Sequence, residues 1–245
     1  MTALAGRLAL VTGATRGIGA AAAAALSRAG ARVVRVARAF PAGPDVRYLD
    51  LTCDLTDPVQ VETLAARVIG VEGVPAVVVS NAGGFLLQPL ERTTPADFDG
   101  QVALNLRGPF LLARAFLPVM RDVGTGSFIS VGSVADHIGL PENAAYAASK
   151  YGLRGLHETL AAEYRGTGVR LTLISPGATD TAIWDPIQPE GRPGFPSRAA
   201  MLRPADVADA ILFAATRPDH VHVDWIRLQP SGRAPPDFNH SDADA

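Results

Sequence analysis

Short apolar runs alternate with helical stretches along almost the whole chain. Strands are predicted at residues 7–12, 32–37, 47–51, 76–80, 127–131, 169–174 and 225–228. Helices are predicted at residues 17–29, 58–69, 95–106, 109–121, 143–164 and 204–215. Apolar strands that alternate with helices indicate a parallel sheet covered on both faces, with right-handed crossovers. We therefore expect an α/β fold with a doubly wound parallel sheet of about seven strands.

Composition supports one globular domain. The chain has 245 residues, 48% of them hydrophobic, and a formal net charge of −2. A near-neutral chain gives no reason to expect nucleic acid as a partner, and we expect no membrane span. The single cysteine, Cys53, fits a reducing cytoplasm. A catalytic thiol is the alternative role for Cys53, but its alternating apolar neighbours favour a strand.

Two stretches and the end of the chain depart from the regular pattern. Only residues 38–46, with Pro41, Gly43 and Pro44, separate the second and third predicted strands, so a short loop must connect them. Residues 180–203 contain four prolines, and we expect a lid-like insertion there. We predict one domain over residues 1–232 and a polar, flexible tail over residues 233–245.

A glycine-rich turn follows the first strand and opens the first helix. It reads Gly13-Ala14-Thr15-Arg16-Gly17-Ile18-Gly19. Glycines let the backbone turn sharply and approach a pyrophosphate, which sits on the N-terminus of the helix. The predicted cofactor contacts are therefore Gly13, Thr15, Arg16, Gly17, Ile18 and Gly19. A turn that serves only packing is the alternative.

The end of the second strand predicts which nicotinamide cofactor binds. An acidic residue there would bind the ribose 2′-hydroxyl, but the strand ends Val36-Ala37-Arg38. Arg16 and Arg38 together suit bidentate recognition of a 2′-phosphate, which predicts NADP(H). The alternative is that both are solvated surface charges.

Tyr146 and Lys150 are four residues apart, so on a helix they share one face. Ser133 follows a predicted strand at the carboxyl edge, where α/β sheets place ligands. Lys150 is the only lysine among 22 basic residues, which indicates a position where a compact ammonium is required. Alone, a tyrosine and a lysine at this spacing would more often be a surface pair.

Taken together, these motifs resemble the short-chain dehydrogenase/reductase family over nearly the whole chain. Besides the glycine turn, the matching segments are Cys53-Asp54-Leu55, Asn81-Ala82-Gly83, the tetrad Asn105, Ser133, Tyr146 and Lys150, and Pro176-Gly177 with Thr179 and Thr181. The resemblance implies a Rossmann-type fold, a nicotinamide cofactor in contact with these segments, and no metal.

The resemblance also implies a separate catalytic role for each residue of the tetrad. A free phenol, with a pKa near ~10, is a poor base at neutral pH, and an adjacent ammonium favours its ionised form. Tyr146 would be the general acid/base, while Lys150 lowers its pKa and holds the nicotinamide ribose. Ser133 would stabilise the substrate oxygen, and Asn105 would hold a water linked to Lys150. A catalytically silent NADP(H)-sensing protein is the alternative function.

The substrate pocket is predicted between the tetrad and the 180–203 insertion. Its candidate walls, which favour an apolar ketone or secondary alcohol, are Phe85, Leu86, His137, Ile138, Leu140, Trp184 and Phe195. His137 is either a substrate contact or a plain loop residue. Arg192 and Arg198 either bind an anionic substrate or are solvated lid residues. The carboxyl end resembles a carbonyl reductase branch that acts on 3-oxo and 3-hydroxy acids. Family members form dimers or tetramers through the two helices around residues 109–121 and 146–164, so we expect a homodimer or homotetramer.

Overall fold

The sheet is parallel throughout and has the predicted seven strands. The computed structural model describes residues 3–40, 45–192 and 194–232. The strands are β1 (Leu8–Thr12), β2 (Arg32–Ala37), β3 (Leu49–Thr52), β4 (Val77–Ser80), β5 (Gly126–Val131), β6 (Val169–Pro176) and β7 (Trp225–Leu228). They lie in the order β3-β2-β1-β4-β5-β6-β7, with every neighbouring pair parallel. The chain reverses its direction across the sheet between β1 and β4, which is where such sheets bind ligands.

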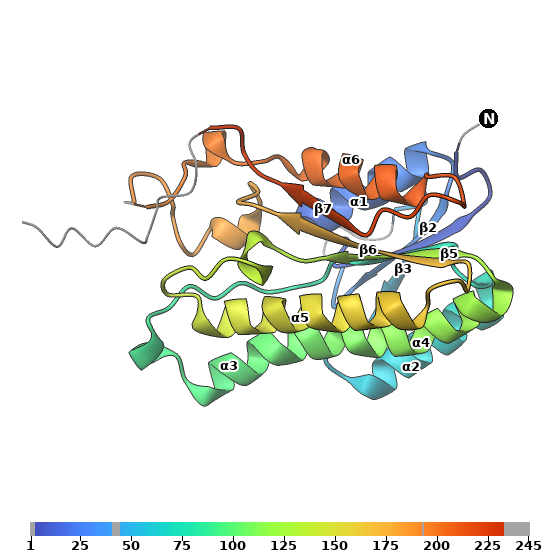
Figure 1. Cartoon of the computed structure of the whole chain (residues 1–245), viewed down its shortest axis with the longest axis horizontal. Coiled ribbons are helices and arrows are strands. Elements are labelled where there is room, and N and C mark those ends of the chain that lie inside the picture. The colour runs from blue at the N-terminus through green and yellow to red at the C-terminus, as the bar shows by residue number, and fades with distance from the viewer. Residues whose placement is uncertain (1–2, 41–44, 193, 233–245) are drawn as a thin grey trace, which may run out of the picture.

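Helices cover both faces of this sheet, as Figure 1 shows. On one face lie α1 (Gly17–Arg28) and α6 (Pro204–Ala215). On the other lie α2 (Pro58–Arg67), α4 (Gly108–Val123) and α5 (Ala144–Glu163), with α3 (Pro95–Val102) leading into α4. The predicted α/β fold class, a Rossmann-type doubly wound sheet, is therefore confirmed.

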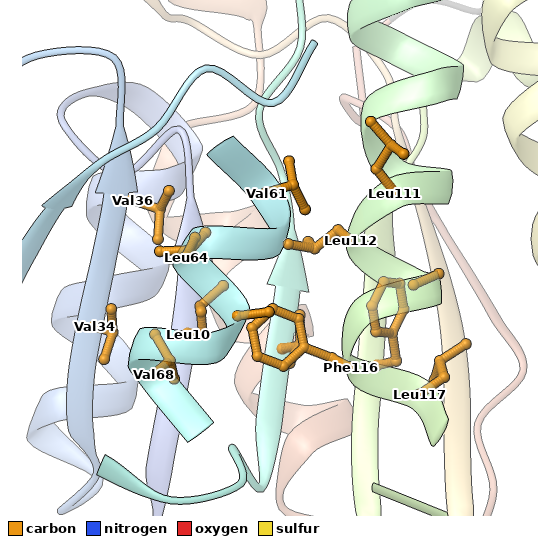
Figure 2. Close-up of a cluster of buried hydrophobic side chains, with 14 of the residues drawn as sticks. Leu10, Val34, Val36, Val61, Leu64, Val68, Leu111, Leu112, Phe116 and Leu117 are labelled. Atoms are coloured by element: carbon orange, nitrogen blue, oxygen red, sulfur yellow. The ribbon is translucent and has the colours of Figure 1, made fainter. Parts of the chain in front are cut away.

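The core is divided into two layers by the sheet. All five residues of β1 are buried, and they alternate between the layers: Leu10 packs on the α2 and α4 side, Val11 on the α1 and α6 side. Figure 2 shows the first layer, in which Phe116 of α4 lies beside the strand residues. Burial on both faces explains why the strands read as continuous apolar runs.

The two helices predicted at 95–106 and 109–121 form one continuous helix. A π-helical turn, Ala103–Arg107, joins α3 to α4. Pro109 lies in the first turn of α4, directly after this π-helical turn, where its missing N–H costs little. The structure therefore joins the two predicted helices.

The joined helix Pro95–Val123 is also long and apolar enough, by length and composition, to cross a membrane. Its α4 half packs in the core through Leu112, Phe116 and Met120. Packing against the sheet accounts for its apolar character.

The insertion at 180–203 is irregular, as predicted. Over its described residues, 180–192 and 194–203, it contains two short 3-10 turns, Ala182–Trp184 and Arg198–Ala200, and no longer helix. A bridge between Thr179 and Leu202 joins its two ends. Arg198 donates to Asp180 at 2.9 Å and to Asp185 at 2.5 Å, which ties the insertion to itself. The predicted tail at 233–245 and residues 41–44 of the β2–β3 connection lie outside the described residues.

Candidate functional site

The glycine turn after β1 is held against the turn after β4. The buried hydroxyl of Thr12 accepts hydrogen bonds from the main-chain N–H groups of Asn81 (3.0 Å) and Ala82 (3.1 Å). The amide of Asn81 donates to the Thr12 carbonyl at 2.9 Å. These bonds join the two strands at which the sheet changes direction, and they explain why Asn81-Ala82 sits beside the glycine turn.

The glycines of the turn are required by geometry. Gly13 has φ +64°, and a Cβ there would lie 2.9 Å from the Ala82 Cα. A Cβ on Gly19 would lie 2.2 Å from the Gly13 carbonyl oxygen. A side chain at either position would therefore displace the backbone that forms the turn.

The N-terminus of α1 is open to a ligand. Arg16 precedes the helix, and no side chain caps its first N–H groups. Arg16 and Arg38 both line the adjoining cavity, where Ala37 ends β2 without a carboxylate. This arrangement fits an anionic cofactor at the helix N-terminus, with two guanidinium groups nearby.

One large cavity, of about 1800 Å³, runs along the carboxyl ends of the strands. Most of the predicted cofactor residues line it: Gly13, Thr15, Arg16, Gly17, Ile18, Arg38, Asp54, Leu55, Asn81, Ala82, Gly83, Tyr146, Lys150, Pro176, Gly177, Thr179 and Thr181. Ser133 lines it as well. Gly19 and Asn105 do not, because both are buried behind the surface of the cavity. The cavity has space for a dinucleotide and a small substrate together.

Three of the four predicted catalytic residues meet at the floor of this cavity. Ser133 follows β5 and is buried; its hydroxyl accepts a hydrogen bond from the Ala135 N–H at 3.2 Å. Its own proton is therefore free to be donated. On α5, the Lys150 Nζ lies 5.8 Å from the centre of the Tyr146 ring and donates to the Val131 carbonyl at 3.1 Å.

Burial dominates the ionisation of Tyr146 and Lys150. It raises the pKa of Tyr146 to about 12, although a hydrogen bond with the Ser133 hydroxyl acts in the opposite direction. It lowers the pKa of Lys150 to about 8. In the protein alone the pKa of Tyr146 is therefore raised, because lost hydration dominates, and its lowering by Lys150 stays a prediction. Below pH 8 the site holds a neutral phenol, able to donate a proton, beside a charged amine.

Asn105 lies in the π-helical turn and braces the site from behind. Its amide oxygen accepts from the Gly84 N–H at 2.9 Å, and its nitrogen donates to the Gly84 carbonyl at 3.0 Å. The nitrogen also contacts Gln101 Oε1 at 3.0 Å and Ser149 Oγ of α5 at 3.1 Å. These contacts make Asn105 a structural link between the Gly84 loop and α5, whereas its predicted link to water stays a prediction.

Aromatic rings line the end of the cavity beside Tyr146. Phe85 contacts the ring of Tyr146 edge-on, with ring centres 4.8 Å apart, and it also packs on Trp184 at 5.4 Å. Trp184 in turn contacts Phe195 of the insertion at 6.2 Å. Of the predicted walls, Phe85, Ile138, Leu140, Trp184 and Phe195 line the cavity. Leu86 and His137 do not line it. The His137 ring packs on Trp225 instead.

Polar groups that the sequence did not single out stand at the same end. Glu142 and Asn143, which precede α5, line the cavity, and the Glu142 carboxylate pairs with Arg192 of the insertion at 3.0 Å. The one sequence signal that could have identified Glu142 and Asn143 is their position just before α5, the helix that carries Tyr146. Arg198 is paired within the insertion and does not line the cavity.

Cys53 lines the cavity but is buried, and burial raises the pKa of its thiol to about 11. A thiol in that state is a weak nucleophile at neutral pH. The structure therefore opposes the alternative of a catalytic cysteine.

Comparisons with known proteins identify similar chains. Residues 7–191 match the family model described as short chain dehydrogenase. D-threitol dehydrogenase from Mycolicibacterium smegmatis is 34% identical over 224 residues, which cover 86% of each chain. The structure resembles a metagenomic short-chain oxidoreductase in complex with NADP (TM-score 0.78, 34% identity, 94% of this chain and 100% of the other). It also resembles an alcohol dehydrogenase from the archaeon Thermococcus sibiricus complexed with 5-hydroxy-NADP (TM-score 0.81, 27% identity, 94% and 98%).

Proposed function

This chain belongs to the short-chain dehydrogenase/reductase family, and from that premise we propose that it transfers hydride between NADP(H) and a carbonyl compound or secondary alcohol. The observation that carries the proposal is the meeting of Ser133, Tyr146 and Lys150 at the floor of a cofactor-sized cavity. An oxidoreductase of this family uses a nicotinamide cofactor; the NADP(H) preference and the roles of single residues are the proposed part.

The cofactor fits the residues that surround the cavity. Gly13 and Gly17 line the cavity beside the α1 N-terminus and carry no side chain, so the backbone there can approach a pyrophosphate. Arg16 and Arg38 would hold the 2′-phosphate. Two relatives of known structure are described as complexes with NADP or 5-hydroxy-NADP, which supports this preference. When bound, the cofactor supplies or accepts the hydride.

The chain's own residues perform the proton transfer. The neutral phenol of Tyr146 donates a proton to the carbonyl oxygen during reduction and takes one back during oxidation. Ser133 donates a hydrogen bond to the same oxygen and stabilises the charge that develops there. The ammonium of Lys150, fixed by the Val131 carbonyl, stabilises charge at the phenol and holds the ribose.

We propose a carbonyl substrate with an apolar body and a polar end. The aromatic wall of Phe85, Trp184 and Phe195 supports the first part, and the pair of Glu142 and Arg192 supports the second. Because one relative is named D-threitol dehydrogenase, the panel of test substrates includes hydroxylated compounds. The 3-oxo and 3-hydroxy acids expected from the carboxyl end belong in the same panel.

The assay is a substrate screen that follows NADPH and NADH absorbance with apolar ketones, hydroxyketones and 3-oxo acids, and with polyols for oxidation. We expect NADPH-dependent reduction of at least one class. Tight NADPH binding without turnover of any compound would instead support the sensing protein.

A homodimer or homotetramer through α4 and α5 is also proposed. Phe110 of α4 and Tyr151 of α5 are both 44% exposed, and a Cβ on Gly155 would meet no atom within 4 Å. Such surfaces suit close helix packing between copies.

A further inference from the structure

Asp136 is a fully buried carboxylate beside the catalytic serine, and the mechanism above does not use it. Its exposure is 0%, and it ends the 3-10 turn Val134–Asp136 that begins after Ser133. It does not line the cavity, so it touches neither substrate nor cofactor. Burying a carboxylate is unfavourable unless hydrogen bonds and charges compensate, so a carboxylate in this place needs a physical reason.

The hydrogen bonds around Asp136 identify its Oδ2 as an acceptor. Its Oδ2 accepts from the Ser133 N–H at 3.2 Å and lies 2.6 Å from the Ser175 hydroxyl. The indole N–H of Trp225, which can only donate, is 2.8 Å from the same hydroxyl. The serine proton must therefore point to Asp136. The Nδ1 of His137 lies 2.6 Å from the other carboxylate oxygen.

The carboxylate and Lys150 hold neighbouring residues of one strand end. Lys150 donates to the Val131 carbonyl. At the next residue, Gly132, a Cβ would lie 2.4 Å from Asp136 Oδ2, so the carboxylate packs directly on that backbone. The residue after it, Ser133, donates its N–H to Asp136. Within the described part of the chain, Lys150 has no carboxylate at ion-pair distance.

We infer that Asp136 is a positioning residue: its carboxylate fixes the main chain that presents Ser133 and places a buried negative charge beside the strand end to which Lys150 binds. The kinetic side of this role rests on the proposed function, whereas the charge on Lys150 can be measured without any substrate.

Electrostatics at the site agree with this role. The Asp136 charge raises the pKa of Lys150, against the larger lowering by burial, and also raises the pKa of Tyr146. Arg154 of α5 and His137 of the turn are the other titratable or charged groups that face Asp136. The contacts from β6 and β7, Ser175 and Trp225, do not titrate.

The simpler role for Asp136 is to cap the 3-10 turn. A pH profile distinguishes this role from the proposed role as a buried charge. Loss of a cap would lower stability or turnover equally at every pH. Loss of the charge would move the titration of Lys150 to lower pH. Activity that depends on the Lys150 ammonium would then also decrease at lower pH than in the wild type. A decrease of about one pH unit, typical for losing one nearby opposite charge, would reduce the charged fraction of Lys150 at pH 8 roughly fivefold and at pH 6 hardly at all.

The sequence makes Lys150 directly observable, because it is the only lysine. Protein grown with 13Cε-labelled lysine gives one lysine signal, and its chemical shift against pH reports the protonation of Lys150. We would compare the wild type with Asp136→Asn. The asparagine can keep its oxygen toward Ser133 and Ser175 and donate its NH₂ to His137 Nδ1, so the hydrogen bonds survive. The matched control is Asp122→Asn, whose carboxylate is 68% exposed on the surface of α4.

We expect the Lys150 titration to move to lower pH in Asp136→Asn and to stay in place in Asp122→Asn. In Asp136→Asn, kcat/KM for reduction should decrease roughly fivefold more at pH 8 than at pH 6. An unchanged lysine titration would overturn the inference. Should Asp136→Asn fail to fold, Asp136→Ser removes the same charge with a smaller side chain and carries the same expectation. If the wild type reduced no carbonyl compound, the proposed function would fail while the lysine titration still decided the role of Asp136.

Discussion

Replacement of Asn105 by alanine tests whether this residue acts as a brace. The Asn105 amide reaches four partners, but its nitrogen has only two hydrogens for three acceptors, which leaves about three full hydrogen bonds. Each buried hydrogen bond contributes about 0.5–1.5 kcal/mol net. We therefore expect Asn105→Ala to lower the free energy of unfolding by about 2–4 kcal/mol. With an m-value of about 3 kcal/mol/M, the urea midpoint would fall by about 1 M.

The same variant should lose turnover, because the Ser149 contact positions the segment of α5 that carries Tyr146 and Lys150. Gln101→Ala is the matched control: it removes one of the four partners and should cost less than about 1 kcal/mol. Urea unfolding, followed by fluorescence or circular dichroism, gives both values. A loss of turnover in Asn105→Ala with less than about 1 kcal/mol of destabilisation would refute the brace and favour a role in holding water.

Four further changes test the remaining roles. Tyr146→Phe should reduce kcat by about 10²–10⁴-fold with NADPH binding nearly intact, measured by turnover and by fluorescence titration; an active variant would remove Tyr146 from the mechanism. Lys150→Arg should lose most of its activity, by about tenfold or more, because a planar guanidinium does not fit the buried site of a compact ammonium; full activity would contradict the significance of the lone lysine. Arg38→Asp should weaken NADPH at least about tenfold and NADH little, by equilibrium titration; an unchanged preference would place the 2′-phosphate elsewhere. Burial lowers the pKa of His157 to about 4, so between pH 6.5 and 4 the unfolded chain binds a proton at His157 that the folded chain does not. The free energy of unfolding should therefore decrease as the pH is lowered from 6.5 to 4. Urea unfolding of His157→Gln should show a smaller decrease, and an equal decrease would assign the pH dependence to other groups.

The sequence predicted the parts of the site that depend on local geometry. A glycine turn between a strand and a helix, such as Gly13–Gly19, has few conformations, and a spacing of four residues places Tyr146 and Lys150 on one helix face wherever that helix lies. Strand β1 was equally predictable, since burial on both faces demands an unbroken apolar run.

Features that depend on burial and long-range contact were not predictable in the same way. The raised pKa of Tyr146 could not be predicted, because spacing reveals a neighbouring ammonium but not the loss of water around both groups. His137 was predicted as a wall of the cavity, whereas its ring packs on Trp225, far along the chain. Glu142 meets Arg192 across 50 residues, a separation at which no local pattern gives a signal.

The insertion at 180–203 begins and ends at nearly the same point of the fold, since Thr179 pairs with Leu202 and Arg198 binds Asp180. A loop closed at its base in this way can be exchanged for another without changing the distance that the framework must span. Protein engineers could therefore replace the stretch between Thr181 and Arg198 to alter substrate choice, leaving the nucleotide half of the molecule, built on β1 and β4, untouched.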